Sequence, residues 1–287
     1  MHPPPYQRIL VTGAAGQLGN ELTQQLGSVA IPVTRHDLDL TDTRKLRRVL
    51  LEAKPDLVIN AAAYTAVDHA ESEPDLCFAV NAEAVEYLAK ICQQLDCPLV
   101  QISTDYVFGG DTKRQTPYDV ECQPKPINVY GQSKLAGEQA AATWKKHLIV
   151  RTCGLYSAPP SVPQRGRNFA DTMLILARER DSLQVVDDQV CTPTYVPHFV
   201  DMLQAIVYEG RYGIFHATNQ GATTWFNFAV ELFRQAGIKI EVTPIASSEY
   251  TTEAARPTYS ALHQSSPVDS PRIWHSWQSG LAKYLGC

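Results

Sequence analysis

Short apolar runs rich in branched residues alternate, along the first half of the chain, with segments whose apolar positions recur at helical spacing. The first run, residues 8–12, is apolar in the manner of a strand buried on both faces. The helical segment from Pro74 predicts Phe78, Val85 and Leu88 on its inner face. The predicted strands cover residues 8–12, 30–34, 56–60, 99–103 and 148–152. The predicted helices cover residues 20–26, 74–95 and 129–144, and a further helix begins at a cap formed by residues 41–42 and ends at residue 53.

Strands that alternate with helices of this length need crossover connections, which produce a parallel sheet covered by helices on both faces. Residues 1–152 are therefore predicted to form a doubly wound α/β domain. The alternation weakens afterwards, so residues 153–287 are expected to form mainly a smaller lobe, with some later segments returning to the first domain. In this half we expect helices over 169–180, 196–208 and 225–236, strands over 184–187 and 213–216, a Pro- and Ser-rich loop over 157–166, and a polar segment over 247–271 that wraps the core.

Composition narrows the class of protein. Of the 287 residues, 44% are hydrophobic and 19% charged, which excludes disorder and small disulfide scaffolds. A net charge of −5 without a basic stripe argues against nucleic-acid and anionic-membrane partners. The seven cysteines form no CxxC pair, and the N-terminus lacks the features of a signal peptide. These features predict a soluble cytoplasmic protein with reduced thiols and no transmembrane segment.

Three glycines follow the first predicted strand, in the sequence Gly13-Ala-Ala-Gly16-Gln17-Leu18-Gly19. Gly13 permits a tight turn, Gly16 lets the backbone approach a pyrophosphate, and Gly19 lets the next helix pack closely on the strand. The N-terminus of that helix offers free N–H groups to phosphate oxygens. The same spacing also occurs at tight strand–helix junctions, but its position after the first strand favours a dinucleotide site.

Selectivity between dinucleotides depends on the end of the second strand, where an acidic residue would bind the ribose 2′-hydroxyl of NAD. That end carries Arg35, and the acids Asp37 and Asp39 come slightly later. Arg35 could meet a 2′-phosphate, which favours NADPH as the cofactor. NADH remains the alternative, because a solvated arginine fits the sequence equally well. Asp39 is expected on the adenine side of the pocket.

A threonine, a tyrosine and a lysine suggest carbonyl chemistry. Thr104 follows the fourth strand at the carboxyl edge of the sheet, where ligands bind in such folds. Tyr130 and Lys134 are four residues apart on one helix face. A phenol with a pKa of about 10 needs about 4 kcal/mol of differential stabilisation to titrate near pH 7. Lys134 and an oxidised nicotinamide could supply it together, so the three residues suit hydride transfer to a carbonyl with protonation of its oxygen.

Together these motifs resemble the dTDP-4-dehydrorhamnose reductase family of extended short-chain dehydrogenases/reductases, whose members catalyse the last step of dTDP-L-rhamnose synthesis. The resemblance covers nearly the whole chain and implies a Rossmann domain followed by a lobe that binds a nucleotide sugar. The motifs are the glycine loop, Asn60-Ala61-Ala62, residues 103–108, residues 130–138, Arg151-Thr152, residues 168–174, Asp188-Gln189, residues 192–194, Thr223-Thr224-Trp225 and Ala255-Arg256-Pro257.

The resemblance assigns roles to individual residues. Tyr130 would protonate the C4 oxygen of dTDP-4-dehydro-L-rhamnose while hydride reaches C4, Lys134 would bind the nicotinamide ribose, and Thr104 would orient the keto oxygen. The remaining cofactor candidates are Gly13, Gly16, Gln17, Leu18, Gly19, Arg35, Asp39, Leu40, Ala61, Ala62, Ala63, Tyr64 and Asn81. The further substrate candidates are Thr65, Val67, Asp105, Tyr106, Asn168 and, for the diphosphate, Arg256.

The chain departs from the family at two places. The family often carries Arg-Thr-Ser-Trp, whose indole packs on the sugar, where this chain has Arg151-Thr152-Cys153-Gly154. Leu155 or Tyr156 could substitute for the missing indole. Some members dimerise through Mg²⁺ held by three carboxylates. Here only Glu21 matches, because the other two positions are Pro197 and Ser276, so we expect no metal and leave open a homodimer without one.

Other functions compete with this interpretation. A nucleotide-sugar 4,6-dehydratase commonly has Thr-Asp-Glu where this chain has Thr104-Asp105-Tyr106, so the acid is present and the base is absent. Epimerases share the tyrosine and lysine, although their usual greater length disfavours them. A non-catalytic regulatory subunit, such as the beta subunit of methionine adenosyltransferase, also resembles this family. The intact Thr104, Tyr130 and Lys134 favour an enzyme over that alternative.

Overall fold

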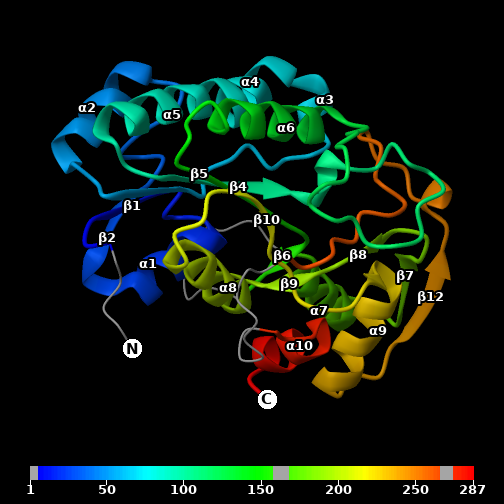
Figure 1. Cartoon of the computed structure of the whole chain (residues 1–287). Helices are drawn as coiled ribbons and strands as arrows, with labels where there is room; N and C mark the ends of the chain where they lie inside the picture. The colour runs from blue at the N-terminus through cyan, green and yellow to red at the C-terminus, as the bar shows by residue number, and fades with distance from the viewer. Residues whose placement is uncertain (1–5, 158–167, 266–273) are drawn as a thin grey trace.

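A parallel six-stranded sheet lies at the centre of the molecule (Figure 1). This computed structural model describes residues 6–157, 168–265 and 274–287, so the predicted 157–166 loop and the end of the 247–271 segment fall largely outside the described residues. The sheet has the order β10-β5-β4-β3-β1-β2 and confirms the predicted fold class. Its strands are β1 (Ile9–Thr12), β2 (Ala30–Val33), β3 (Leu57–Asn60), β4 (Leu99–Thr104), β5 (His147–Thr152) and β10 (Gly213–His216).

Helices cover both faces of this sheet, as Figure 1 shows. On one face, α1 (Gln17–Leu26) and α8 (Val196–Tyr208) bury Leu22, Phe199 and their neighbours against the strands. The other face is covered by α2 (Thr43–Ala53), α5 (Ala84–Leu95) and α6 (Val129–Ala141). Asp42 caps α2 by accepting a hydrogen bond from the backbone N–H of Lys45, so the predicted start of this helix is confirmed.

The predicted helix over residues 74–95 is interrupted. It divides into α4 (Pro74–Phe78), a π-helical turn η2 (Ala79–Glu83) and α5, and a short helix α3 (His69–Ser72) precedes it. Cys77 is fully buried, whereas Phe78, predicted to point inward, is only half-buried. The turn brings the carbonyl oxygen of Asn81 to 2.0 Å from the place where a Cβ on Gly137 of α6 would stand. The backbone of η2 thus lies directly against that of α6, and the π turn shifts the register of the residues that follow it in α5.

The helix predicted over 129–144 ends earlier, at Ala141. Trp144 turns inward instead, and its indole N–H donates a hydrogen bond to the carbonyl oxygen of Cys97 at 2.9 Å. Burial of this large ring together with a satisfied donor favours the turn over another helical residue.

The second half of the chain forms a smaller lobe and also extends the first sheet. Strand β10 pairs with β5, and α8 covers the same sheet, so both return to the first domain. The smaller lobe packs aromatic and aliphatic residues such as Phe228 and Leu232 into a separate core. Its larger elements are α7 (Phe169–Glu179), α9 (Trp225–Ala236), α10 (Trp277–Leu285) and the parallel pair β7 (Ser182–Val186) and β12 (Glu241–Ile245). Its shortest strands are β6 (Leu155–Tyr156), β8 (Val190–Cys191), β9 (Thr194–Tyr195) and β11 (Thr223–Thr224).

A buried ion pair fastens α6 to the sheet. Arg151 on β5 donates from Nε and Nη2 to the two carboxylate oxygens of Glu138 at 2.8 and 2.7 Å. Ser103 on β4 donates to the same carboxylate at 2.6 Å, and the guanidinium lies over the ring of Phe108. The two hydrogen bonds from Arg151 and the third from Ser103 compensate the buried carboxylate of Glu138 for its loss of hydration, as a buried charge requires.

We predict that Glu138→Gln lowers the free energy of unfolding by about 3–5 kcal/mol, because it leaves the Arg151 guanidinium buried without its counter-charge. Urea denaturation followed by circular dichroism would measure the loss. The matched control is Glu231→Gln, which breaks the more exposed pair with Arg234 and should cost only a small fraction of that energy. Equal losses in the two variants would contradict the importance of the buried pair.

Candidate functional site

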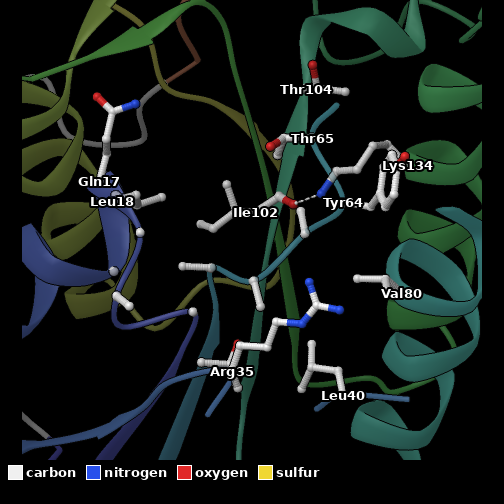
Figure 2. Close-up of a pocket in the computed structure, with 18 of the residues that line it drawn as sticks. Gln17, Leu18, Arg35, Leu40, Tyr64, Thr65, Val80, Ile102, Thr104 and Lys134 are labelled. Carbon is white, nitrogen blue, oxygen red and sulfur yellow. Dashed lines mark hydrogen bonds between the residues drawn. The ribbon is translucent and has the colours of Figure 1, made fainter. Parts of the chain in front are cut away.

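A cavity of about 550 Å³ opens at the carboxyl ends of β1, β3 and β4 (Figure 2). Most of the residues predicted to bind the cofactor line it, and in Figure 2 the glycine-loop residues Gln17 and Leu18 lie on the opposite side of the view from Lys134. The predicted residues that line it are Gly13, Gly16, Gln17, Leu18, Gly19, Arg35, Asp39, Leu40, Ala61, Ala62, Ala63, Tyr64, Thr65, Thr104, Tyr130 and Lys134.

The glycine loop has the shape that its spacing predicts. Gly13 has a φ of +66°, and a Cβ there would stand 2.7 Å from the backbone nitrogen of Ala62. A Cβ on Gly19 would stand 2.2 Å from the carbonyl oxygen of Gly13. The close packing of β1, β3 and α1 therefore leaves no space for a side chain at position 13 or 19. The open N-terminus of α1 has no side-chain cap, which leaves its N–H groups available to a phosphate.

Arg35 and Asp39 lie together at the other end of this cavity (Figure 2 labels Arg35). Nη2 of Arg35 is 3.7 Å from Oδ2 of Asp39, and the arginine side chain is 84% exposed. Hydrogen bonds from the backbone and hydroxyl of Thr41 lower the pKa of Asp39. The guanidinium is thus accessible to an anion at the mouth of the cavity.

Asn81, also predicted to contact the cofactor, lies behind the cavity wall and not on its lining. Its amide accepts a hydrogen bond from the N–H of Tyr64 and donates to the carbonyl oxygen of the same residue, at 2.9 and 3.0 Å. It also donates to Ser133 on α6. Asn81 therefore holds the loop after β3 in place, because η2 turns its side chain toward that loop.

The threonine, tyrosine and lysine converge where β4 meets α6. Tyr130 and Lys134 lie one turn apart on α6 and line the same cavity as Thr104, which ends β4. Nζ of Lys134 donates to the carbonyl oxygen of Ile102 at 2.7 Å, as the dashed line in Figure 2 shows. Burial of this ammonium lowers the pKa of Lys134 to about 8, and the negative charge of Glu138 opposes the shift.

The pKa of Tyr130 is raised, not lowered. Burial is the largest cause, and a hydrogen bond with the Thr104 side chain opposes it only in part. The expected stabilisation of the phenolate joins Lys134 with an oxidised nicotinamide, and without the cofactor burial has the larger effect on the pKa of Tyr130. A raised pKa keeps Tyr130 protonated at neutral pH, which is the form that can donate a proton.

A second cavity of about 200 Å³ shares Thr104 and Tyr130 with the first. The predicted substrate residues Val67, Asp105 and Tyr106 also line it, whereas Thr65 lines the first cavity. Lining residues that sequence reasoning missed are Cys153, Gly154, Gln189, Val190, Cys191, Trp225, Pro257 and Ser260. Gln189 and Trp225 belong to motifs on which the family resemblance rests, so membership of those motifs could have indicated them as residues of the site.

Asp105 connects the two halves of the chain beneath this second cavity. Its carboxylate accepts hydrogen bonds from Ser260 at 2.5 Å, from the thiol of Cys153 at 3.1 Å and from Thr104 at 3.1 Å. Burial raises its pKa, and these three donors act in the opposite direction. The side chain is fully engaged by the protein, so it is built to position its neighbours, Thr104 among them.

Two predicted substrate residues, Asn168 and Arg256, lie outside the linings of both cavities. Asn168 caps α7 by accepting from the N–H of Asp171, and its amide donates to Gln17 at 3.3 Å. Nη2 of Arg256 donates to Asp68 at 2.7 Å, while its buried Nη1 has no hydrogen-bond partner within the described parts of the chain. Asn168 therefore acts as a cap because it stands directly before a helix, and Arg256 is held by an acid 188 positions away.

Neither suggested replacement for the family indole faces the second cavity. Tyr156 is buried in the core of the smaller lobe and donates to the carbonyl oxygen of Trp277 at 3.3 Å. Leu155 lines the first cavity instead. The ring that stands beside Gly154 belongs to Trp225, for which the sequence favours helix packing over ligand stacking, and this ring also lines the second cavity.

Across residues 6–157, 168–265 and 274–287, no group of three or more His, Cys, Asp or Glu side chains is arranged to hold a metal ion. Glu21 lies half-buried on α1, with a proline and a serine at the other two positions considered for a metal bridge. Among the described helices, none has both the length and the apolar composition needed to span a membrane.

Comparisons with known proteins agree with this geometry. The RmlD substrate binding domain family matches residues 7–286. A dTDP-4-dehydrorhamnose reductase of Streptomyces griseus is 42% identical over 276 residues, which are 92% of this chain and 88% of the relative. A dTDP-4-keto-6-deoxy-D-glucose reductase of Streptomyces niveus is 38% identical over 89% of this chain and 90% of its own length.

A solved structure extends the similarity to three dimensions. The dTDP-4-dehydrorhamnose reductase of Bacillus anthracis, crystallised in complex with NADP, superposes with a TM-score of 0.89 at 38% identity, covering 97% of this chain and 98% of that one. The match spans both the sheet domain and the smaller lobe. The chain therefore belongs to the RmlD substrate binding domain family, the family of the dTDP-4-dehydrorhamnose reductases that its sequence resembles.

Proposed function

We propose that this protein is an oxidoreductase that uses NADPH to reduce the C4 keto group of dTDP-4-dehydro-L-rhamnose to dTDP-L-rhamnose. The observation that carries the proposal is the meeting of the two cavities at Thr104 and Tyr130. One cavity has a phosphate-binding glycine loop, and the other reaches into the smaller lobe. A cofactor and a sugar placed in them would meet beside a proton donor, and relatives that share most of the chain bear the name of this activity.

The first cavity fits a dinucleotide phosphate. Gly13 and Gly19 let β1, β3 and α1 pack closely, and Gly16 would let the backbone approach a pyrophosphate. The exposed Arg35 could bind the 2′-phosphate that distinguishes NADPH from NADH. Lys134, whose Nζ donates to the carbonyl oxygen of Ile102, would bind the hydroxyls of the nicotinamide ribose. NADPH, when bound, supplies the hydride that adds to C4 of the sugar.

The protein supplies the proton that completes the reduction. Tyr130 donates its phenolic proton to the C4 oxygen, so that hydride on carbon and proton on oxygen together give the alcohol. Burial keeps Tyr130 protonated beforehand, as reduction requires. The hydroxyl of Thr104 donates to Asp105 in the free protein, and its single proton would turn to the C4 oxygen and polarise the carbonyl when the keto sugar binds. The ammonium of Lys134 then stabilises the phenolate that remains.

The second cavity and the loops around it would bind the substrate. Val67 and Tyr106 line the space for the sugar, and Thr65 lines the first cavity, which shares Thr104 and Tyr130 with it. Arg256 remains a candidate for the diphosphate because its guanidinium fork, oriented by Asp68 through Nη2, matches phosphate oxygens.

Dehydratase and regulatory functions are weaker candidates. Tyr106 occupies the position where a dehydratase commonly has its base, and a phenol in this buried place has a raised pKa. A regulatory subunit would not require Thr104, Tyr130 and Lys134 to converge on a cavity. Reduction of a keto sugar made in situ, followed as loss of NADPH absorbance at 340 nm, tests the proposal directly. Absence of turnover with a folded protein would overturn it.

We predict that Tyr130→Phe lowers kcat/KM by about 10²–10⁴-fold, because the ring remains and only the proton donor is removed. The Kd of NADPH, measured by fluorescence titration, should change by less than about threefold, since the phosphate loop is untouched. Tyr208→Phe, at an exposed tyrosine on α8, is the matched control and should have wild-type kinetics. Undiminished turnover in Tyr130→Phe would eliminate Tyr130 as the proton donor.

We predict that Arg35→Ala raises the Kd of NADPH about tenfold and leaves the Kd of NADH unchanged, because only NADPH offers a 2′-phosphate to the guanidinium. Titrations of both cofactors under the same salt conditions would measure the preference. Arg211→Ala removes another exposed arginine, away from both cavities, and should alter neither constant. A cofactor preference that survives in Arg35→Ala would show that another group recognises the 2′-phosphate.

A further inference from the structure

An indole from the smaller lobe forms one wall of the second cavity. Trp225 is the first residue of α9 and lines the cavity together with Thr104 and Tyr130. Most of the other lining side chains are small or polar, and of the four tryptophans in the chain it alone lines this cavity. The cavity therefore combines one broad apolar surface with a few polar groups, which is the usual composition of a site that binds a small molecule.

The start of α9 is held rigidly, so the backbone of Trp225 has a defined position. Thr224 caps the helix by accepting from the N–H of Asn227 at 3.1 Å. The same hydroxyl donates to the carboxylate of Asp187 at 2.5 Å. Strand β11 also pairs with β8, which places Thr224 opposite Val190, another residue of the lining.

Aromatic neighbours fix the orientation of the indole itself. The ring of Phe169 lies 4.6 Å from that of Trp225, and the ring of Phe228 lies 6.1 Å away in an edge-on arrangement. Phe228 belongs to the buried core of the smaller lobe, whereas Phe169 and Trp225 are half-buried at its border. One side of the indole is thus packed on the core, and the remaining surface reaches the cavity.

Gly154 makes room for this ring. It has a φ of +50°, and a Cβ built there would stand 3.0 Å from Cη2 of Trp225 and 3.3 Å from Cα of Pro193. Any side chain at position 154 would be strained and would press on the edge of the indole. Gly154 follows β5, whose last residue pairs with Thr104, so the indole edge comes close to the catalytic strand end.

We propose that Trp225 is a specificity-determining residue whose indole packs against the apolar face and C6 methyl group of the 6-deoxysugar, with Gly154 leaving the space that the ring occupies. This inference rests on the proposed function. A 6-deoxyhexose presents C–H groups and a methyl group that water solvates poorly, and an aromatic ring is a suitable surface for them. The polar groups of the lining, with Thr104, Tyr130 and Gln189, are left for the oxygens.

Steady-state kinetics of two Trp225 variants and one control variant test the inference. Trp225→Ala should raise the KM for the keto sugar about tenfold or more and leave the KM for NADPH within about twofold. Trp225→Phe retains an aromatic surface and should keep both values within about threefold. Val230→Ala, an exposed position on the same helix, is the control and should match the wild type. An unchanged KM for the keto sugar in a folded Trp225→Ala variant would overturn the inference.

Intrinsic fluorescence gives a readout that does not depend on turnover. Titration with dTDP-L-rhamnose should quench the wild-type emission, and Trp225→Phe should lose most of that change while still binding the ligand in calorimetry. This variant keeps the test decisive even if Trp225→Ala fails to fold. Equal quenching in Trp225→Phe and the wild type would overturn the inference. Failure of the wild type to reduce the keto sugar would instead overturn the proposed function, so the two failures are distinguishable.

Discussion

The arrangement of the site depends on one buried ion pair, in which Arg151 on β5 binds Glu138 on α6 through two hydrogen bonds. Tyr130, Lys134 and Glu138 stand on successive turns of α6 and therefore share one face of the helix. Fastening Glu138 to the sheet sets the rotation of that helix about its axis. Lys134 and Tyr130 are then directed over the end of β4, where Thr104 lies.

Close backbone approach is the second constraint. Gly137 on α6 leaves no room for a side chain against Asn81, and Gly13 and Gly19 do the same where β1, β3 and α1 meet. A methyl group at any of these glycines would push the two contacting backbone segments apart and so alter the wall of the cofactor cavity. The ion pair attracts α6 to the sheet, and the glycines allow the surrounding elements to follow it.

Much of this could be predicted from the sequence, because the signals are local. Strands, helices and the glycine loop follow from periodicity within about 20 residues, and the strand ends place Thr104 near Ala61 and Ala62. Interruptions such as the π turn at Ala79–Glu83 could not be read in the same way, since they arise from contact with α6. The hydrogen bonds of Asn81 and Asn168 could not be predicted for a similar reason: each amide also bonds to the backbone of another segment.

The sequence by itself determined the parallel α/β fold, the cofactor loop and the identity of the tyrosine, lysine and threonine, since each depends on residues close together in the chain. Only the tertiary structure decided how the smaller lobe completes the second cavity. Asp105 meets Ser260 across 155 positions, and Trp225 stands beside Gly154, where the family pattern has its own indole. Such pairs have no local signature, because the packing of two cores against one sheet edge brings them together.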